Sequence, residues 1–261
     1  MDPVREHVST VTLQGIALPV VRRGSGPPLL LLHGGGGPQD RLPFFHQLTL
    51  HFDVIAPIHP GFDGSPIPDH FDGMEDLVYL YLDLMDALDL HDIILLGFSM
   101  GGWAAAEIAV RNTSRLSQLI LVDAVGIKPG DRETRDIADI FGLPASDIPP
   151  LLFHDPSKAP NPAEFTEDQL TILASDRIAL ALYTWEPYMH NPKLPQRLHR
   201  IGVPTLLIWG ASDGLVSVSY AEAYRQMIPE SKLVVIPEAG HLPQVEQPEL
   251  FLDHVLSFAA H

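Results

Sequence analysis

A single serine stands between glycines where an apolar run meets a stretch of small residues. The segment DIILLGFSMGGWAAAEIA begins at Asp92, and Ser99 lies within its Gly-Phe-Ser-Met-Gly pattern. A serine in this pattern between a strand and a helix takes a strained turn that exposes its hydroxyl, and only small residues at positions 97 and 101 allow so tight a turn. The segment therefore predicts a strand–turn–helix unit with Ser99 as a candidate nucleophile.

Apolar runs of strand length recur along the chain and alternate with helical stretches. Residues 8–22 alternate loosely about Gly15, which predicts a hairpin of early strands. The amphipathic pattern of residues 74–90 predicts a helix, and two more are expected around 217–228 and 247–259. Strands that are apolar throughout and alternate with helices indicate an α/β fold, with a mostly parallel sheet covered on both faces.

Residues 127–200 interrupt this alternation. They are rich in proline and aspartate, and they contain two predicted helical segments, around 132–141 and 166–183. In parallel sheets, ligands bind at the carboxyl ends of the strands. We therefore expect residues 127–200 to form a helical cap over those ends, with residues 1–126 and 201–261 forming one core.

Composition and charge narrow the classes of partner. The net charge of −17 makes a nucleic-acid partner unlikely, and the lack of cysteine excludes disulfides and thiolate metal sites. No apolar run approaches ~18 residues, and the first ten residues hold no apolar targeting region. We expect a cytoplasmic protein that acts on a small molecule and has no membrane partner; a homodimer stays an open alternative.

A serine nucleophile needs a base, and thirteen histidines compete for that role. His241 follows the last predicted strand, in the loop segment IPEAGHLPQVEQPE, at the sheet edge where Ser99 also lies. His33 precedes a glycine run and is expected to brace that loop by hydrogen bonding. Solvated or core positions are expected for His46, His51, His91 and His254. His241 is therefore the candidate base.

The base in turn needs a carboxylate that orients its ring. Asp213 in LLIWGASDG and Asp123 in LILVDAVG both follow predicted strands, and either one satisfies the chain order Ser, Asp, His. Asp213 is favoured because its strand immediately precedes the strand that leads to His241. Asp123 stays the alternative.

Two backbone N–H groups are expected to form an oxyanion hole. One is that of Met100 at the start of the predicted helix, and the other is that of Gly35 in HGGGG, with Gly36 as the neighbouring option. The HGGGG loop lacks the Gly-Lys-Ser/Thr ending of a phosphate loop, and no cluster with metal-ligand spacing is present. We expect neither a cofactor nor a metal.

Together these segments resemble the α/β-hydrolase superfamily over nearly the whole chain, from His33 onward. The matching stretches are LLHGGGG, PGFDGS, GFSMGG, WGASD and the Gly-His pair at 240–241. The resemblance implies an eight-stranded sheet, a helical cap inserted after LILVDA, and a triad of Ser99, Asp213 and His241 that works without a cofactor. Haloalkane dehalogenases and epoxide hydrolases of this superfamily carry an aspartate at the serine position, so Ser99 argues against these two groups.

Two subfamilies are most similar. One contains capped carboxylesterases and lactonases, and the other contains meta-cleavage-product hydrolases, which cut C–C bonds and also carry an HGGG loop and Ser-Met-Gly-Gly. The chain departs from the second group at Phe98, where those enzymes usually have asparagine, and at Leu242, where they usually have tryptophan. We therefore expect hydrolysis of a small-to-medium carboxylic ester or lactone through an acyl-enzyme on Ser99. C–C bond hydrolysis is the alternative, and a receptor that retains the triad and binds a small ligand is the alternative from another class.

Several residues are candidates for the substrate pocket besides Gly36. Three of them close the predicted cap in the stretch YTWEPYMHNP, and one follows the serine on its helix. Ordinary packing inside the cap explains aromatic and methionine side chains equally well. The candidates are Trp103, Trp185, Tyr188 and Met189.

Overall fold

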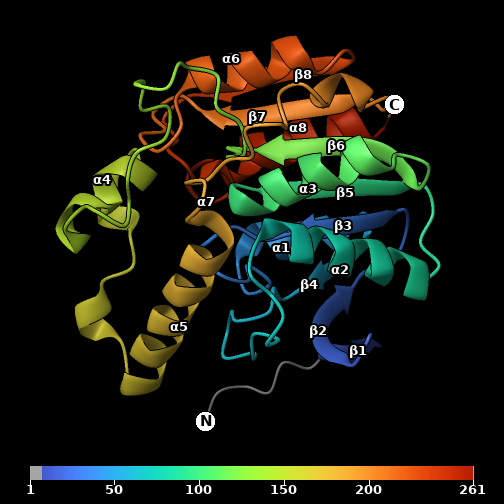
Figure 1. Ribbon diagram of the computed structural model, residues 1–261, viewed down its shortest axis with the longest axis horizontal. Coiled ribbons are helices and arrows are strands. Elements are labelled where there is room, and N and C mark those ends of the chain that lie inside the picture. Colours follow the sequence, from blue (N-terminus) through green and yellow to red (C-terminus); the bar gives the residue numbers. More distant parts are fainter. Residues whose placement is uncertain (1–7, 261) are drawn as a thin grey trace.

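Eight strands form one sheet in the computed structural model, which describes residues 8–260 (Figure 1). Their order across the sheet is β1-β2-β4-β3-β5-β6-β7-β8. The strands are β1 (Val8–Leu13), β2 (Ile16–Arg23), β3 (Pro28–Leu32), β4 (Asp53–Pro57), β5 (Ile93–Phe98), β6 (Leu116–Val122), β7 (Thr205–Gly210) and β8 (Ser231–Ile236).

The strand directions confirm the predicted sheet. β1 and β2 form the expected antiparallel hairpin, whose two turn residues, Gln14 and Gly15, both have positive φ. β2 also pairs antiparallel with β4. The remaining pairs are parallel: β4–β3, β3–β5, β5–β6, β6–β7 and β7–β8. The carboxyl ends of the parallel strands therefore meet at one edge, where their loops can assemble a site.

Helices cover both faces of the sheet, and each face has its own apolar cluster. Phe44 and Phe251 belong to the cluster under α1 and α8, whereas Leu77 and Ala104 belong to the cluster under α2, α3 and α6. The helices predicted around 74–90, 217–228 and 247–259 are confirmed. These core helices are α1 (Pro43–Leu48), α2 (Met74–Ala87), α3 (Met100–Arg111), α6 (Val218–Met227), α7 (Pro243–Glu246) and α8 (Pro248–Ala259).

Residues 127–200 carry helices and no named strand, and α4 and α5 stand beyond the strand ends in Figure 1. The boundaries predicted for the cap (127–200) and the core (1–126 and 201–261) stay a prediction, and residues 1–7 and 261 lie outside the described residues. The elements of this segment are η1 (Ala145–Asp147), α4 (Pro149–Leu152), η2 (Pro156–Lys158), η3 (Pro162–Glu164), α5 (Glu167–Thr184) and η4 (Leu198–Arg200).

Of the two helices predicted in this segment, one is confirmed and one is wrong. The helix expected around 166–183 is α5, which begins at a capping box between Thr166 and Gln169. The helix expected at 132–141 is absent. Asp131 accepts hydrogen bonds from the N–H groups of residues 133 and 134, and Ile137 forms a bridge to Val216. Local side-chain bonds of this kind compete with helix formation.

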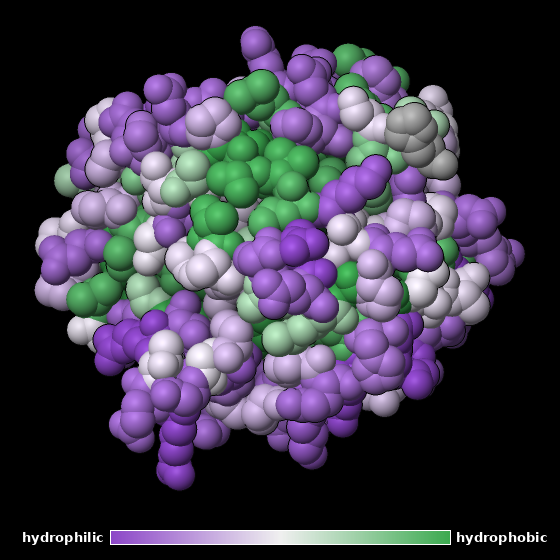
Figure 2. Space-filling model, turned by 90° about the horizontal axis from the view of Figure 1, so that it is seen from above, coloured by the Kyte–Doolittle hydropathy of each residue, from purple (hydrophilic) through white to green (hydrophobic). Residues whose placement is uncertain are grey.

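The β8 edge of the sheet lies on the side shown in Figure 2, where apolar surface appears among hydrophilic residues. Val235 on β8 and Leu250 on α8 are 39% and 40% exposed. The homodimer left open above stays a prediction.

Across residues 8–260, no helix combines the length and the hydrophobicity that a membrane crossing requires.

Candidate active site

Ser99 occupies a strained turn between β5 and α3. Its φ of 50° and ψ of −114° are unusual for a residue with a side chain. A Cβ on Gly97 would lie 2.3 Å from the carbonyl oxygen of Gly101, and a Cβ on Gly101 would lie 2.3 Å from that of Leu32. The turn that the glycine spacing predicts is therefore present, and both glycines are required by close backbone approach.

His241 and Asp213 meet in the loops after β8 and β7. The Nδ1 of His241 lies 2.7 Å from Oδ2 of Asp213, and both side chains are almost fully buried. Because the Asp213 oxygen can only accept, Nδ1 carries the proton and the lone pair of a neutral ring is on Nε2. The two residues expected to be base and orienting acid are thus in direct contact.

The Asp213 carboxylate is held by its own loop. Its Oδ1 accepts hydrogen bonds from the N–H groups of Leu215 at 2.8 Å and Val216 at 3.0 Å. Its other oxygen is then directed at His241. The backbone after β7 therefore orients the carboxylate toward His241.

Ser99 and His241 share no hydrogen bond in the described residues. Nε2 of His241 is buried and has no partner there. Catalytic hydrogen bonds are often long before substrate binds. The free Nε2 lone pair is thus available to accept a proton.

The glycine loop after β3 packs directly on Ser99. A Cβ on Gly34 would lie 3.2 Å from Cβ of Ser99, so the loop passes beside the hydroxyl. Gly35 faces helix α5, since its Cβ would lie 2.8 Å from Leu180. Gly36 is exposed, with nothing within 4 Å of a Cβ there. The roles predicted for Gly35, Gly36 and the Met100 N–H stay predictions.

Two stacked histidines brace this loop, as expected for His33. The rings of His33 and His59 lie 3.6 Å apart, and the His59 N–H donates to Nε2 of His33. Nδ1 of His33 then donates to the carbonyl of Gly34, while Nε2 of His59 donates to the carbonyl of His33 at 2.8 Å. The remaining ring nitrogen of His59 accepts from the hydroxyl of Tyr81. Both rings are therefore neutral, and each tautomer is determined by its partners.

The buried His59 predicts a specific loss of stability in acid. Burial lowers the pKa of His59 from 6.5 to about 4. The unfolded chain therefore takes up the proton first as pH falls, and stability is lost between about pH 6.5 and pH 4. Between pH 7 and pH 5, the unfolding free energy of the wild type should fall by about 2 kcal/mol more than that of His59→Gln. Glutamine keeps one acceptor and one donor at this position.

Urea unfolding at the two pH values measures this effect. The matched control is His46→Gln on α1, which makes the same substitution at an exposed histidine. Equal pH dependence in the His59→Gln variant and the wild type would contradict the prediction.

Residues 127–200 are hydrogen-bonded to both loops that carry Asp213 and His241. Carbonyl oxygens at the end of α4 accept from the N–H of Gly214 at 2.9 Å and of His241 at 2.8 Å. The buried carboxylate of Glu246 on α7 accepts from Gly240, His154 and Asp155 at 2.6–3.0 Å. The position of His241 thus depends on contacts with the end of α4 and with Glu246.

The side chains predicted for the substrate pocket lie in different surroundings. Trp185 is 58% exposed and packs on Phe141, and the Tyr188 hydroxyl bonds the backbone of residues 138 and 140. Met189 is buried, and Trp103 lines a hollow of about 420 Å³ between α2, α3 and the end of the cap. Their contribution to substrate binding stays a prediction.

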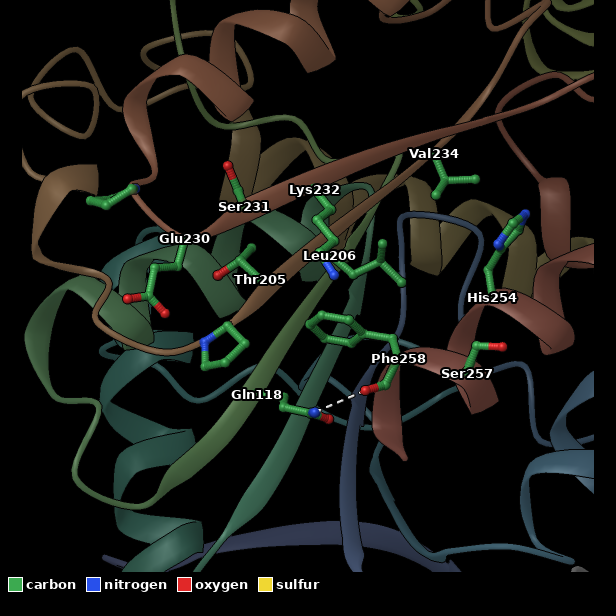
Figure 3. A pocket seen from close by; sticks show the side chains of 12 residues that line it. Gln118, Thr205, Leu206, Glu230, Ser231, Lys232, Val234, His254, Ser257 and Phe258 are labelled. Carbon is green, nitrogen blue, oxygen red and sulfur yellow. Dashed lines mark hydrogen bonds between the residues drawn. The ribbon is translucent and has the colours of Figure 1, made fainter. Parts of the chain in front are cut away.

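Another hollow lies at the amino ends of the strands, on the opposite side of the sheet from the carboxyl ends. Figure 3 shows it between the amino ends of β6 to β8 and helix α8, with a volume of about 580 Å³ and Gln118, Leu206 and Phe258 among its lining residues. Gln118 donates to the carbonyl of Phe258 there at 3.0 Å. Because Ser99, Asp213 and His241 follow carboxyl ends of strands, this hollow is not part of the candidate active site.

Sequence reasoning missed His59, Tyr81 and Glu246. His59 follows β4 in the stretch HPGFDGS, and a histidine just after a predicted strand was the available signal. Glu246 lies five residues after His241 in QVEQPE, where its burial could not be anticipated. Acidic residues near a chain turn are usually solvated, so Glu246 gave no signal.

A strained serine and a buried His–Asp pair, both following carboxyl ends of strands in a mostly parallel sheet, define a class of protein. The chain belongs to the alpha/beta hydrolase family, whose model matches residues 29–254.

Individual relatives differ in their named activities. The chain is 28% identical, over 89% of its length, to the dihydrolipoyllysine-residue acetyltransferase component of an acetoin cleaving system from Pseudomonas putida, and it spans 63% of that protein. It is 27% identical to a 2-hydroxy-6-oxo-2,4-heptadienoate hydrolase from Pseudomonas putida, over 91% of this chain and 90% of the relative. A crystal structure of a membrane phospholipase A has a TM-score of 0.80 at 26% identity, covering 97% of this chain and 85% of that one.

Proposed function

We propose that this protein is a serine hydrolase that cleaves a small-to-medium carboxylic ester or lactone through an acyl-enzyme on Ser99. The observation that carries the proposal is the strained Ser99 turn at the strand edge where the His241–Asp213 pair lies. A chain keeps such backbone strain where it holds a functional group in a reactive position.

The first half of the reaction begins with proton removal from Ser99. Nε2 of His241 accepts the hydroxyl proton while Oγ forms a bond to the carbonyl carbon of the substrate. The imidazolium that results donates Nδ1–H to Asp213, whose charge stabilises it. Both ring nitrogens are then protonated, and no further group is needed to hold the proton.

The negative charge moves to the former carbonyl oxygen. The Met100 N–H is the first of α3 and has no acceptor within the helix, so it can point at that oxygen together with the helix dipole. The Gly35 N–H, on the loop that packs against Ser99, supplies the second donor. Two such donors form an oxyanion hole.

The tetrahedral intermediate collapses when the C–O bond of the leaving alcohol breaks. His241 gives its proton to the departing oxygen, and Ser99 keeps the acyl group. Water then attacks the acyl-enzyme with His241 again as the base, which releases the acid and restores the serine. Apart from the attacking water, every step uses groups that this chain carries.

Hydrolysis of a C–C bond is the second candidate, since one relative is named a heptadienoate hydrolase. That reaction also needs donors that stabilise a dienolate. Phe98 is 3% exposed and packs against Phe44 and Phe251 in the core, so position 98 supplies no donor. Leu242 has no polar group. Arginines from residues 127–200 are the other possible donors, and three of them are exposed at the surface: Arg132, Arg135 and Arg177.

We expect kcat/KM for a short or medium acyl ester to exceed that for a meta-cleavage dienone at least ~100-fold, which is about 2.7 kcal/mol of transition-state stabilisation. A p-nitrophenyl ester, a lactone and a vinylogous diketone, assayed on one preparation, measure this ratio. Faster cleavage of the diketone, the substrate for C–C cleavage, would favour C–C bond hydrolysis as the function. A single burst with trapped product would instead favour a ligand receptor.

A further inference from the structure

Asp123, the alternative acid, lies beside the Asp213–His241 pair. It follows β6, and because β6 and β7 are adjacent, its N–H donates to Ile208 at 3.0 Å. Its Oδ1 accepts from the N–H of Gly210 at 2.9 Å, and the residue is completely buried. Its φ of 44° holds it in the left-handed region, where asparagine and aspartate are favoured.

The carboxyl groups of Asp123 and Asp213 are close neighbours. One ligand atom from each of Asp123, Asp213 and His241 lies within 4.8 Å of the other two. The two carboxyl groups are close enough to share a hydrogen bond when one of them holds a proton. Yet Oδ2 of Asp123 has no donor among residues 8–260. Two acceptors therefore adjoin each other at buried positions.

The surrounding donors decide which carboxyl holds the proton. Asp213 accepts three N–H groups, two from its loop and one from His241, whereas Asp123 accepts only that of Gly210. Two buried carboxylates this close together do not both stay ionised, and hydrogen bonds to the charged form favour ionisation of the carboxylate that accepts more of them.

We propose that Asp123 is a protonated carboxylic acid that donates a hydrogen bond from Oδ2–H to Asp213 and so positions it for His241. The consequence for catalysis rests on the proposed function, because it requires Asp213 to act as the orienting acid. Asp123 is a positioning residue, since it touches neither substrate nor reacting atoms. The pair then presents a single negative charge to His241.

The electrostatics of the site agree with this assignment. Burial raises the pKa of Asp123 well above its usual range, the charge of Asp213 raises it further, and the Gly210 N–H opposes the shift. The titratable groups that face Asp123 are Asp213 from the loop after β7 and His241 from the loop after β8. A divalent cation bound by the three residues is a competing arrangement, but Nδ1 of His241 already donates to Asp213 and has no lone pair to offer.

Two substitutions separate a neutral donor from a second charge. Asp123→Asn keeps a donor and suits the left-handed backbone, so we expect kcat/KM within about threefold of wild type and an unchanged acidic limb of its pH profile. Asp123→Ala removes the donor, so kcat should fall about tenfold with little change in KM. If Asp123 were ionised, Asp123→Asn would remove a negative charge beside His241 and move the acidic limb to lower pH. That shift, or wild-type activity in Asp123→Ala, would overturn the proposal.

A second measurement needs no substrate. Infrared spectroscopy near neutral pH should detect the carbonyl stretch of a protonated carboxylic acid in the wild type and in Ser99→Ala, and this band should be missing from Asp123→Asn. The proposal would be overturned if this band were absent from the wild type or persisted in Asp123→Asn. One tightly bound divalent metal ion per chain would also overturn it. If the band behaves as expected while the wild type hydrolyses no ester, the proposed function fails and the protonated pair stands.

Discussion

Ser99→Ala is expected to abolish covalent labelling by a fluorophosphonate probe and to lower kcat for an ester by about 10⁶-fold, the loss seen when a triad nucleophile is removed. The reason is that every later step starts from the bond between Oγ and the acyl carbon. The fold should persist, because alanine removes one atom and the turn depends on the glycines at 97 and 101. Active-site mass spectrometry and ester kinetics measure both effects.

Ser117→Ala is the matched control for this experiment. Ser117 lies near the start of β6, where its hydroxyl donates to the carbonyl of Asp92 at 2.9 Å, far from the carboxyl edge of the sheet. This variant should label and turn over like the wild type. Labelling that survives Ser99→Ala would show that another residue is the nucleophile.

Asp213→Asn is expected to lower kcat by up to about 10⁴-fold while the protein stays folded. Oδ1 of Asp213 accepts the N–H groups of Leu215 and Val216, so the amide oxygen of asparagine should take that position. The amide NH₂ then faces Nδ1 of His241 and forces the proton onto Nε2. Nε2 can no longer accept the proton of Ser99, and no carboxylate remains to stabilise the imidazolium.

Asp123→Asn is the matched comparison, because it makes the same chemical change in the neighbouring carboxyl. Its loss in kcat should be far smaller than that of Asp213→Asn. Steady-state kinetics of the two variants on one ester, with circular dichroism to check folding, measure the difference. A larger loss in Asp123→Asn would assign the acid to the loop after β6.

The sheet and the serine turn were predictable because their causes are local. The glycines that allow the turn lie within two residues of Ser99, and an uninterrupted apolar run specifies a buried parallel strand. The contact of Asp213 with His241 also followed from the sequence, because carboxyl ends of parallel strands meet at one edge. The helix expected at 132–141 failed because apolar spacing there says nothing of the turn that Asp131 forms or the bridge from Ile137 to Val216.

Other parts of the site came only from tertiary structure. His33, His59 and Tyr81 are separated by more than twenty residues at each step, and only the adjacency of β3 and β4 with α2 brings them together. The buried Glu246 is recognisable only once the end of α4 lies against α7. The sequence by itself determined which residue types follow which strands, because strand and turn formation depend on near neighbours. Only the tertiary structure decided which buried polar groups share protons, as Asp123 and Asp213 do in our proposal, because burial and hydrogen-bond partners depend on distant segments.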